Sequence, residues 1–148
     1  MPHLLILHGP NLGLLGTREP QVYGTTTQHE LVDAVSAGAA GLGWSCDFMQ
    51  SNHEGALLDA ILTAPGTYDA ILLNPSAYTH TSIAIRDAVS AVSVPVVEVH
   101  LSNVHAREPY RRISYVAEAA AATISGAGPD GYFAALTILD RRHREAAA

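Results

Sequence analysis

The sequence predicts an alternating α/β protein with a parallel sheet covered by helices on both faces. Short apolar runs alternate with segments of helical periodicity along the whole chain, a pattern typical of right-handed βαβ units. Apolar residues make up 48% of the chain and charged residues only 15%, which indicates a buried core. A length of 148 residues suits one domain, so we expect residues 1–148 to fold as a single unit.

Five apolar runs have the length of buried strands. They cover residues 4–7, residues 44–49, residues 70–73, a run that starts at residue 94, and residues 122–125. Five strands in a chain of this length predict a flavodoxin-like doubly wound sheet.

Four helices are expected between and after these strands. Thr27 followed by Glu30 has the spacing of a capping box and should open the first helix, and Ser51 with Glu54 repeats that spacing before the second. Pro129 stands near the start of the last helix, a position that suits proline. The apolar stripes of the four helices run through Leu31, Val35, Ala39 and Leu42; Leu57, Leu58, Ile61 and Leu62; Ile85, Ala88, Val89 and Val92; and Tyr132, Leu136 and Leu139.

Charge and composition argue against several classes of function. The net charge of −6 leaves no basic stripe that could bind nucleic-acid phosphates. All 8 basic side chains are arginines, and a chain without lysine cannot use a lysine Schiff base. The single cysteine, Cys46, has no partner for a disulfide within the chain, which suits the cytoplasm. Neither a signal peptide nor a membrane-spanning run of about 20 apolar residues is expected.

The run that starts at residue 94 is the most informative segment. Side chains alternate across a strand, so Glu98, His100 and Ser102 share one face, opposite a row of apolar residues. A strand covered by helices on both faces normally consists almost entirely of Val, Ile and Leu, and polar groups there cost desolvation free energy unless they are partnered or used. We therefore expect a functional site here. The alternative is a half-exposed strand with a solvated polar face.

Polar residues also follow the other strands. In a doubly wound fold, ligands bind beyond the carboxyl ends of the strands. Each of these residues alone would be an ordinary turn residue, but their joint position predicts a binding site. The residues expected to converge there are Asn11, Asn74, His80, His100, Ser102 and Asn103.

Two other kinds of site receive little support from the motifs. The loop GPNLGLLG matches neither the dinucleotide-binding pattern nor the P-loop pattern, so flavin or nucleotide binding is not expected. The 8 histidines never place two side chains on one helix face beside a third ligand, so a metal site is not expected.

Residues 16–27 form a polar segment bounded by glycines, which is typical of a mobile lid. Arg18 and Tyr23 lie close together in this segment. A tyrosine hydroxyl ordinarily titrates near pH 10, and a nearby arginine stabilises its ionised form. One or two arginines would therefore allow a tyrosinate base; the alternative is a loop tyrosine that packs on the surface.

Glu98 and His100 are spaced so that their side chains can contact each other. The carboxylate would orient the imidazole and favour its protonated form, as a general acid requires; the alternative is a structural hydrogen bond. The THTS run, residues 79–82, supplies hydroxyls and a ring at the start of a helix, where an anion is favoured; the alternative is helix capping by Thr81 or Ser82. Asp87, one turn into that helix, is expected on the surface or beside an arginine.

Four segments, in this order and spacing, resemble the type II 3-dehydroquinate dehydratases: GPNLGLLGTREPQVYG, QSNHEG, NPSAYTHTSIAIRDA and EVHLSNVHAREPYRRISY. The resemblance spans nearly the whole chain. It implies a flavodoxin-like fold and the removal of water from 3-dehydroquinate by anti elimination through an enolate, giving 3-dehydroshikimate without metal or cofactor. That reaction serves aromatic amino acid biosynthesis in the shikimate pathway, or quinate breakdown. The resemblance also implies a homo-oligomer in which trimers stack into a dodecamer.

The resemblance further implies a role for each polar residue. Tyr23 would be the base, with Arg18 holding it ionised. Asn11 would position a water against the enolate oxygen, as in an oxyanion hole. His100, backed by Glu98, would be the acid that protonates the departing hydroxyl. The residues assigned to substrate binding are Asn74, His80, Leu101, Ser102, Arg111 and, reaching a neighbouring subunit's site, Asp87.

Arg107 would lie near the same site and assist Arg18. Three positions depart from the family pattern, none of them at an expected catalytic residue: Gly13 stands where many members have Asn, Ser76 where Gly is usual, and Ile113 where His is common. The second hypothesis for the function is a flavodoxin-like ligand-binding protein that keeps the pocket without turnover.

Overall fold

The computed structural model describes residues 1–148 and contains a five-stranded parallel sheet. The strand order is β2-β1-β3-β4-β5, and each neighbouring pair is parallel. This is the order of a flavodoxin-like doubly wound sheet, so the predicted fold class is confirmed. The strands are β1 (His3–His8), β2 (Ser45–Gln50), β3 (Ala70–Asn74), β4 (Val96–His100) and β5 (Ala122–Ser125).

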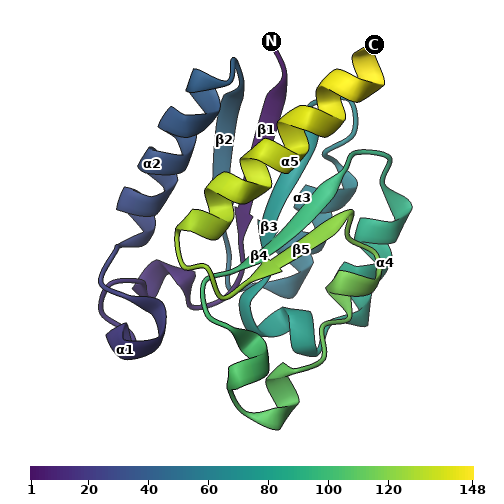
Figure 1. Cartoon of the computed structure of the whole chain (residues 1–148). Coiled ribbons are helices and arrows are strands. Elements are labelled where there is room, and N and C mark those ends of the chain that lie inside the picture. The colour runs from purple at the N-terminus through teal and green to yellow at the C-terminus, as the bar shows by residue number, and fades with distance from the viewer.

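Helices cover both faces of the sheet. In Figure 1, α2 and α5 lie in front of the strands, and α3 and α4 lie behind them. Each pair of helices buries its own apolar core against the sheet. The α-helices are α1 (Pro20–Tyr23), α2 (Gln28–Gly41), α3 (Glu54–Leu62), α4 (Ile83–Ala91) and α5 (Asp130–Ala147). Short 3₁₀ helices are η1 (Leu12–Leu14), η2 (Ser76–His80), η3 (Val104–Ala106), η4 (Pro109–Arg111) and η5 (Val116–Glu118).

The expected capping box of α2 is confirmed, and the one expected for α3 is wrong. Glu30 N donates to Thr27 Oγ1, and Thr27 N donates back to the Glu30 carboxylate. Before α3, the N-cap is His53, and the Ser51 hydroxyl accepts from the His53 N–H instead. The Glu54 carboxylate accepts from the Ser82 hydroxyl, 3.0 Å away at the start of α4. A partner distant in sequence thus replaces the local one.

β4 is buried along its whole length, so the alternative of a solvated polar face is wrong. Glu98 is 0% exposed and His100 is 7% exposed. The apolar residues on the opposite face pack into the core under α2 and α5. The strand ends at His100, and Ser102 lies just beyond it in the following loop.

The loops after β1 and β3 meet closely at the carboxyl edge of the sheet. A side chain at Gly9 would bring its Cβ within 2.4 Å of the Pro75 carbonyl oxygen, so only glycine fits there. The Gly9 N–H donates to the Asn74 carbonyl at 2.8 Å. Between β1 and β3 the connections diverge to opposite sides, which makes this edge the expected ligand site of the fold. No helix in the structure is both long enough and apolar enough to cross a membrane.

Candidate active site

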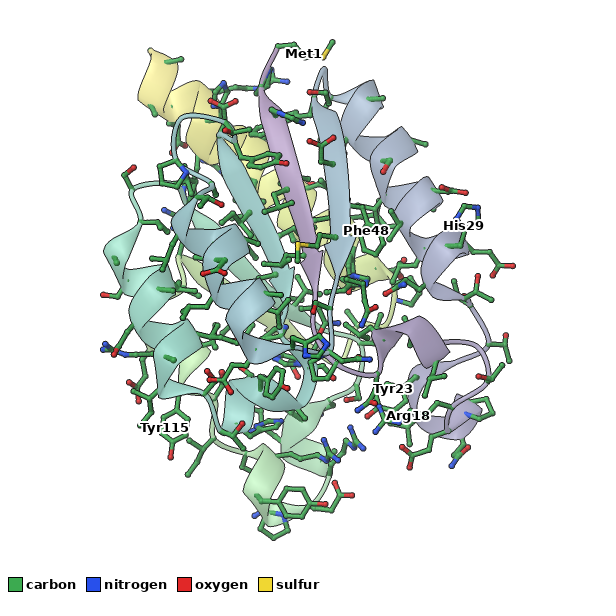
Figure 2. The ribbon with its side chains drawn as sticks, turned by 180° about the vertical axis from the view of Figure 1, so that it is seen from behind. Met1, Arg18, Tyr23, His29, Phe48 and Tyr115 are labelled. Atoms are coloured by element: carbon green, nitrogen blue, oxygen red, sulfur yellow. The ribbon has the colours of Figure 1, made fainter.

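A pocket of about 470 Å³, including the part open to solvent, lies at this edge, within the usual size range for small-molecule sites. Figure 2 shows Tyr23 and Arg18 side by side at this end of the molecule, opposite Met1. Asn103, expected at the same rim, does not line the pocket: its side chain accepts from the His105 N–H as a turn residue. The polar residues that line the pocket are Asn11, Arg18, Tyr23, Asn74, Ser76, His80, His100, Ser102, Arg107 and Arg111, together with the predicted Leu101.

Tyr23 is held by an arginine from the loop after β4. Arg107 Nη1 donates to the Tyr23 hydroxyl oxygen at 2.7 Å and lies 3.3 Å from the Ser102 hydroxyl. The Arg107 side chain is only 13% exposed. A guanidinium held this close to a phenol oxygen stabilises negative charge on it.

Arg18 makes a less direct contact with Tyr23 than the sequence predicted. Its guanidinium carbon lies 5.1 Å from the centre of the Tyr23 ring, and the group pairs with Glu19 at 3.6 Å. The direct contact to the hydroxyl belongs to Arg107, which the sequence placed second. Tyr23 nevertheless has two guanidinium groups close to its ring, since the Arg107 guanidinium carbon is also 5.1 Å from the ring centre.

His100 and Glu98 form the buried pair that their spacing predicted. His100 Nε2 lies 2.7 Å from Glu98 Oε2, so Nδ1 is the ring nitrogen left without a protein partner. Glu98 also accepts from three hydroxyls, those of Thr79, Ser114 and Thr123. Burial alone would raise the pKa of Glu98, but the contacts to His100, Thr79 and Ser114 outweigh it and leave this pKa below its usual value. The Glu98 carboxylate therefore lies ionised against His100 Nε2 and fixes the orientation of the imidazole ring.

These three hydroxyls are the part of the site that sequence reasoning missed. Thr79 belongs to the THTS run, for which the sequence predicted helix capping or anion binding, and Ser82 does cap α4 by accepting from Ile85 N. Ser114 and Thr123 carry no local signal, because they reach Glu98 only through the tertiary fold.

His80 sits beside His100, with ring centres 6.3 Å apart and nearly parallel rings. Its Nδ1 lies 2.7 Å from the Ile113 carbonyl oxygen, so Nδ1 carries the proton and Nε2 is free to accept a hydrogen bond. Burial lowers the pKa of His80, and the nearby His100 and Arg111 lower it further. The pocket therefore contains one imidazole, His80, suited to be neutral, beside a second that is paired with a carboxylate.

The pocket is positively charged although the chain carries a net charge of −6. Its lining includes Arg18, Arg107 and Arg111 and no acidic side chain. The Glu108 carboxylate lies at the rim of the pocket, where its side chain is 45% exposed. It pairs with the Arg111 guanidinium at a distance of 2.8 Å. Such a pocket favours a small anionic ligand, because guanidinium groups bind carboxylates in a fixed geometry.

The lining of the pocket includes residues with strained backbone conformations. Three residues other than glycine have positive φ, and two of them, Asn11 (67°) and Ser76 (53°), line the pocket. Such conformations cost about 1–2 kcal/mol and concentrate at functional sites. Asn11 is fixed in place by its N–H, which donates to the Asn52 side chain at 3.0 Å.

One predicted site residue lies apart from the others. Asp87 is on α4, where its side chain is 63% exposed and pairs with Arg86 at 3.0 Å. It does not line the pocket of its own chain. Nowhere in the structure do three or more His, Cys, Asp or Glu side chains gather in a way that could hold a metal ion.

Comparisons with known proteins show the family of the chain. Residues 2–140 match the family model for dehydroquinase class II. The chain belongs to the class II dehydroquinase family. It is 56% identical to a 3-dehydroquinate dehydratase from Ruegeria pomeroyi over 139 aligned residues. These residues make up 94% of this chain and 93% of the relative. It is 54% identical over 136 residues to a catabolic 3-dehydroquinase 2 from Neosartorya fischeri, covering 92% and 91% of the two chains.

The fold agrees as closely. The crystal structure of the type II dehydroquinase from Propionibacterium acnes superposes with a TM-score of 0.91 at 39% identity, over 95% of this chain and 97% of the other. As a class II dehydroquinase, the chain is an enzyme and a hydro-lyase.

The structure gives the settings of the three positions that were expected to depart from the family pattern. Ser76 has the left-handed backbone that favours glycine. Ile113 contributes its backbone carbonyl to His80, while its side chain is 60% exposed. A Cβ at Gly13 would have its nearest neighbour 3.8 Å away, so the position has room for a side chain.

Proposed function

We propose that the chain is a 3-dehydroquinate dehydratase that uses Tyr23 as the base and His100 as the acid, with neither metal nor cofactor. The observation that carries this proposal is the pairing of the two groups. A tyrosine bonded to Arg107 and a histidine bonded to Glu98 line one arginine-rich pocket. We also propose that residues 1–148 form one catalytic domain.

The first step is proton removal from the carbon next to the substrate ketone. The Tyr23 phenolate takes this proton, and the electrons of the C–H bond move onto the ketone oxygen, giving an enolate. Arg107, with Arg18 near the ring, stabilises the phenolate before the transfer. Asn11 holds a water against the enolate oxygen, in the manner of an oxyanion hole.

The second step is loss of the hydroxyl. The electrons on the enolate oxygen restore the ketone, the enolate C=C pair moves to the neighbouring carbon–carbon bond to make the new double bond, and the bond from carbon to the hydroxyl oxygen breaks. His100 donates a proton to the departing oxygen, which leaves as water. Nδ1 is the donor, because Nε2 is occupied by Glu98.

Binding falls to the remaining polar groups. Ser102 and the backbone at Leu101 and Ser102 meet the substrate carboxylate, while Asn74, His80 and Arg111 hold the ring hydroxyls or that carboxylate. The cationic lining supports an anionic substrate, and the neutral His80, with Nε2 unprotonated, supports a hydroxyl as its partner.

An ultraviolet assay tests the activity. Purified protein is mixed with 3-dehydroquinate, and the absorbance of the conjugated enone carboxylate product is followed, alone, with EDTA, and after borohydride treatment. A rise that neither reagent changes supports the proposal. A flat trace from folded protein overturns it and favours the ligand-binding hypothesis, and inhibition by EDTA overturns the metal-free route.

Asp87 requires a separate proposal. Because it is exposed and lies outside its own pocket, we assign it to the pocket of a neighbouring copy in a homo-oligomer, with trimers stacked into a dodecamer. The exposed Ile83 (58%) on the same helix supports a contact surface there. Light scattering should give the mass of twelve chains, and Asp87→Asn should lower kcat/KM without changing that mass. A monomer with full activity would contradict this assignment.

A further inference from the structure

A chain of hydrogen bonds, buried except at its outer end, leads from the pocket along the face of the sheet that α5 and α2 cover, and ends on α2. Asn74 Nδ2 donates to the Tyr132 hydroxyl oxygen at 2.9 Å, and this hydroxyl lies 2.8 Å from His8 Nε2. His8 Nδ1 lies 3.0 Å from Gln28 Oε1. The four side chains come from β3, α5, β1 and α2. Only Asn74 among them lines the pocket.

The direction of every bond follows from one backbone group. The Ser76 N–H can only donate, and it donates to Asn74 Oδ1 at 3.1 Å, so the amide nitrogen of Asn74 must face Tyr132. The Tyr132 oxygen accepts from that nitrogen, and its own hydrogen therefore goes to His8 Nε2. His8 then carries its proton on Nδ1 and donates it to Gln28.

Burial makes this arrangement costly to disturb. Tyr132 and His8 are 0% exposed and Asn74 is 3% exposed. Burial lowers the pKa of His8 to about 4, so its ring is neutral near pH 7, as the arrangement requires. Burial also raises the pKa of Tyr132, which keeps its hydroxyl protonated. No buried polar side-chain atom in the structure lacks a partner, and losing one link would leave such an atom.

We propose that Tyr132 and His8 are positioning residues that lock the Asn74 carboxamide in one orientation, with its second N–H available to the ligand. The inference rests on the proposed function in that Asn74 binds the substrate. The locked amide presents a donor at a fixed place, which suits a ring hydroxyl or carboxylate oxygen. The outer end of the chain is Gln28, where residues 16–27 join α2. The hydrogen bonds therefore connect Asn74 in the pocket to the end of the segment, residues 16–27, that carries Tyr23.

Tyr132→Phe is the direct test because it removes the hydroxyl and keeps the ring. KM for 3-dehydroquinate should rise about three- to tenfold, the loss of one ligand hydrogen bond, with a smaller change in kcat. Tyr68→Phe is the matched control: it removes a hydroxyl that bonds Asp47 at 2.9 Å, outside the pocket, and should leave KM unchanged.

A double-mutant cycle separates positioning from general damage. Asn74→Ala and Tyr132→Phe should each raise KM, and the double variant should be no worse than Asn74→Ala alone. His8→Leu should resemble Tyr132→Phe, whereas His8→Gln, which keeps an acceptor and a donor, should restore most of the affinity. A wild-type KM in Tyr132→Phe, or effects that multiply in the double variant, would overturn the proposal.

The wild-type protein offers a readout that needs neither a variant nor activity. Nitrogen NMR of the imidazole rings should show His8 protonated at Nδ1 and unprotonated at Nε2 near pH 7. The opposite tautomer would overturn the proposal even if the enzyme turned over. Conversely, absence of dehydratase activity with the expected tautomer would refute the proposed function and leave the hydrogen-bond chain intact.

Discussion

The two sides of the pocket are built in different ways. His100 and Glu98 lie on β4, 7% and 0% exposed, and are fixed by a ring of hydroxyls. Tyr23 and Arg18 lie in the segment between β1 and α2, and they meet an arginine from another loop. The side assigned to the acid is therefore held by buried hydrogen bonds, and the side assigned to the base by charge between loops.

This difference has a physical consequence. Buried hydrogen bonds fix geometry, but each one becomes costly when a partner is lost. Charge held between loops is screened by salt but can rearrange when a ligand enters. We expect changes on the strand side to affect folding as well as turnover, and changes on the loop side to affect turnover alone.

The largest effects should come from the two proton-transfer groups. Tyr23→Phe and His100→Ala should each lower kcat by about 10²–10⁴-fold, while substrate still binds, because they remove proton transfer rather than recognition. Steady-state kinetics with a separate binding measurement checks this. Turnover close to wild type in either variant would refute the role assigned to that residue.

The two arginines beside Tyr23 should differ in importance. Arg107→Lys should lower kcat about 10–100-fold, and more than Arg18→Lys does, because only Arg107 contacts the hydroxyl and an ammonium does not reproduce the guanidinium geometry. Arg141→Lys, at an exposed pair on α5, is the control and should be neutral. A larger loss in Arg18→Lys would return the main role to Arg18.

The ranking of these arginines also shows how far the sequence alone can go. The predicted strand boundaries correctly indicated that Asn11, Asn74 and His100 lie at one edge of the sheet, because the carboxyl ends of parallel strands meet at the same edge. Local spacing predicted the α2 capping box but failed at Glu54, whose partner Ser82 comes from another helix. Contacts between residues far apart in the chain leave no local pattern. The family resemblance placed Arg107 near the site, but its direct hydrogen bond to Tyr23, and the hydroxyls of Ser114 and Thr123 around Glu98, came only from the structure.

Acid should destabilise the folded protein through His8, the buried histidine at the end of β1. The unfolded chain binds a proton at this residue near pH 6.5, whereas burial holds the folded pKa at about 4. The unfolded state therefore binds more protons between these values, and the free energy of unfolding should fall by roughly 3 kcal/mol as the pH drops from 6.5 to 4.

Denaturant titrations at several pH values check this, with carboxylates contributing equally to each variant. His8→Gln should lack that part of the slope. His29→Gln, on the outer side of α2 in Figure 2 and 86% exposed, should keep it. Identical slopes for His8→Gln and wild type would show that His8 is not the group responsible.

The smallest expected effect concerns the strained backbone of the pocket. Ser76→Gly should raise the free energy of unfolding by less than about 1 kcal/mol, since relief of the left-handed conformation is partly offset by unfolded-chain entropy. Ser93→Gly, an exposed position without positive φ, should instead lower it slightly. A clear loss of stability in Ser76→Gly would mean that its side chain contributes more than its backbone costs.

Hydrogen exchange tests the division between the two sides most directly. The substrate, 3-dehydroquinate, is incubated in deuterated water with each variant, and NMR follows the proton on the carbon next to the ketone. His100→Ala should exchange this proton for deuterium without forming product, because Tyr23 can still make the enolate. Tyr23→Phe should neither exchange the proton nor form product. Exchange that persists in Tyr23→Phe would contradict the account, because another group would then be the base.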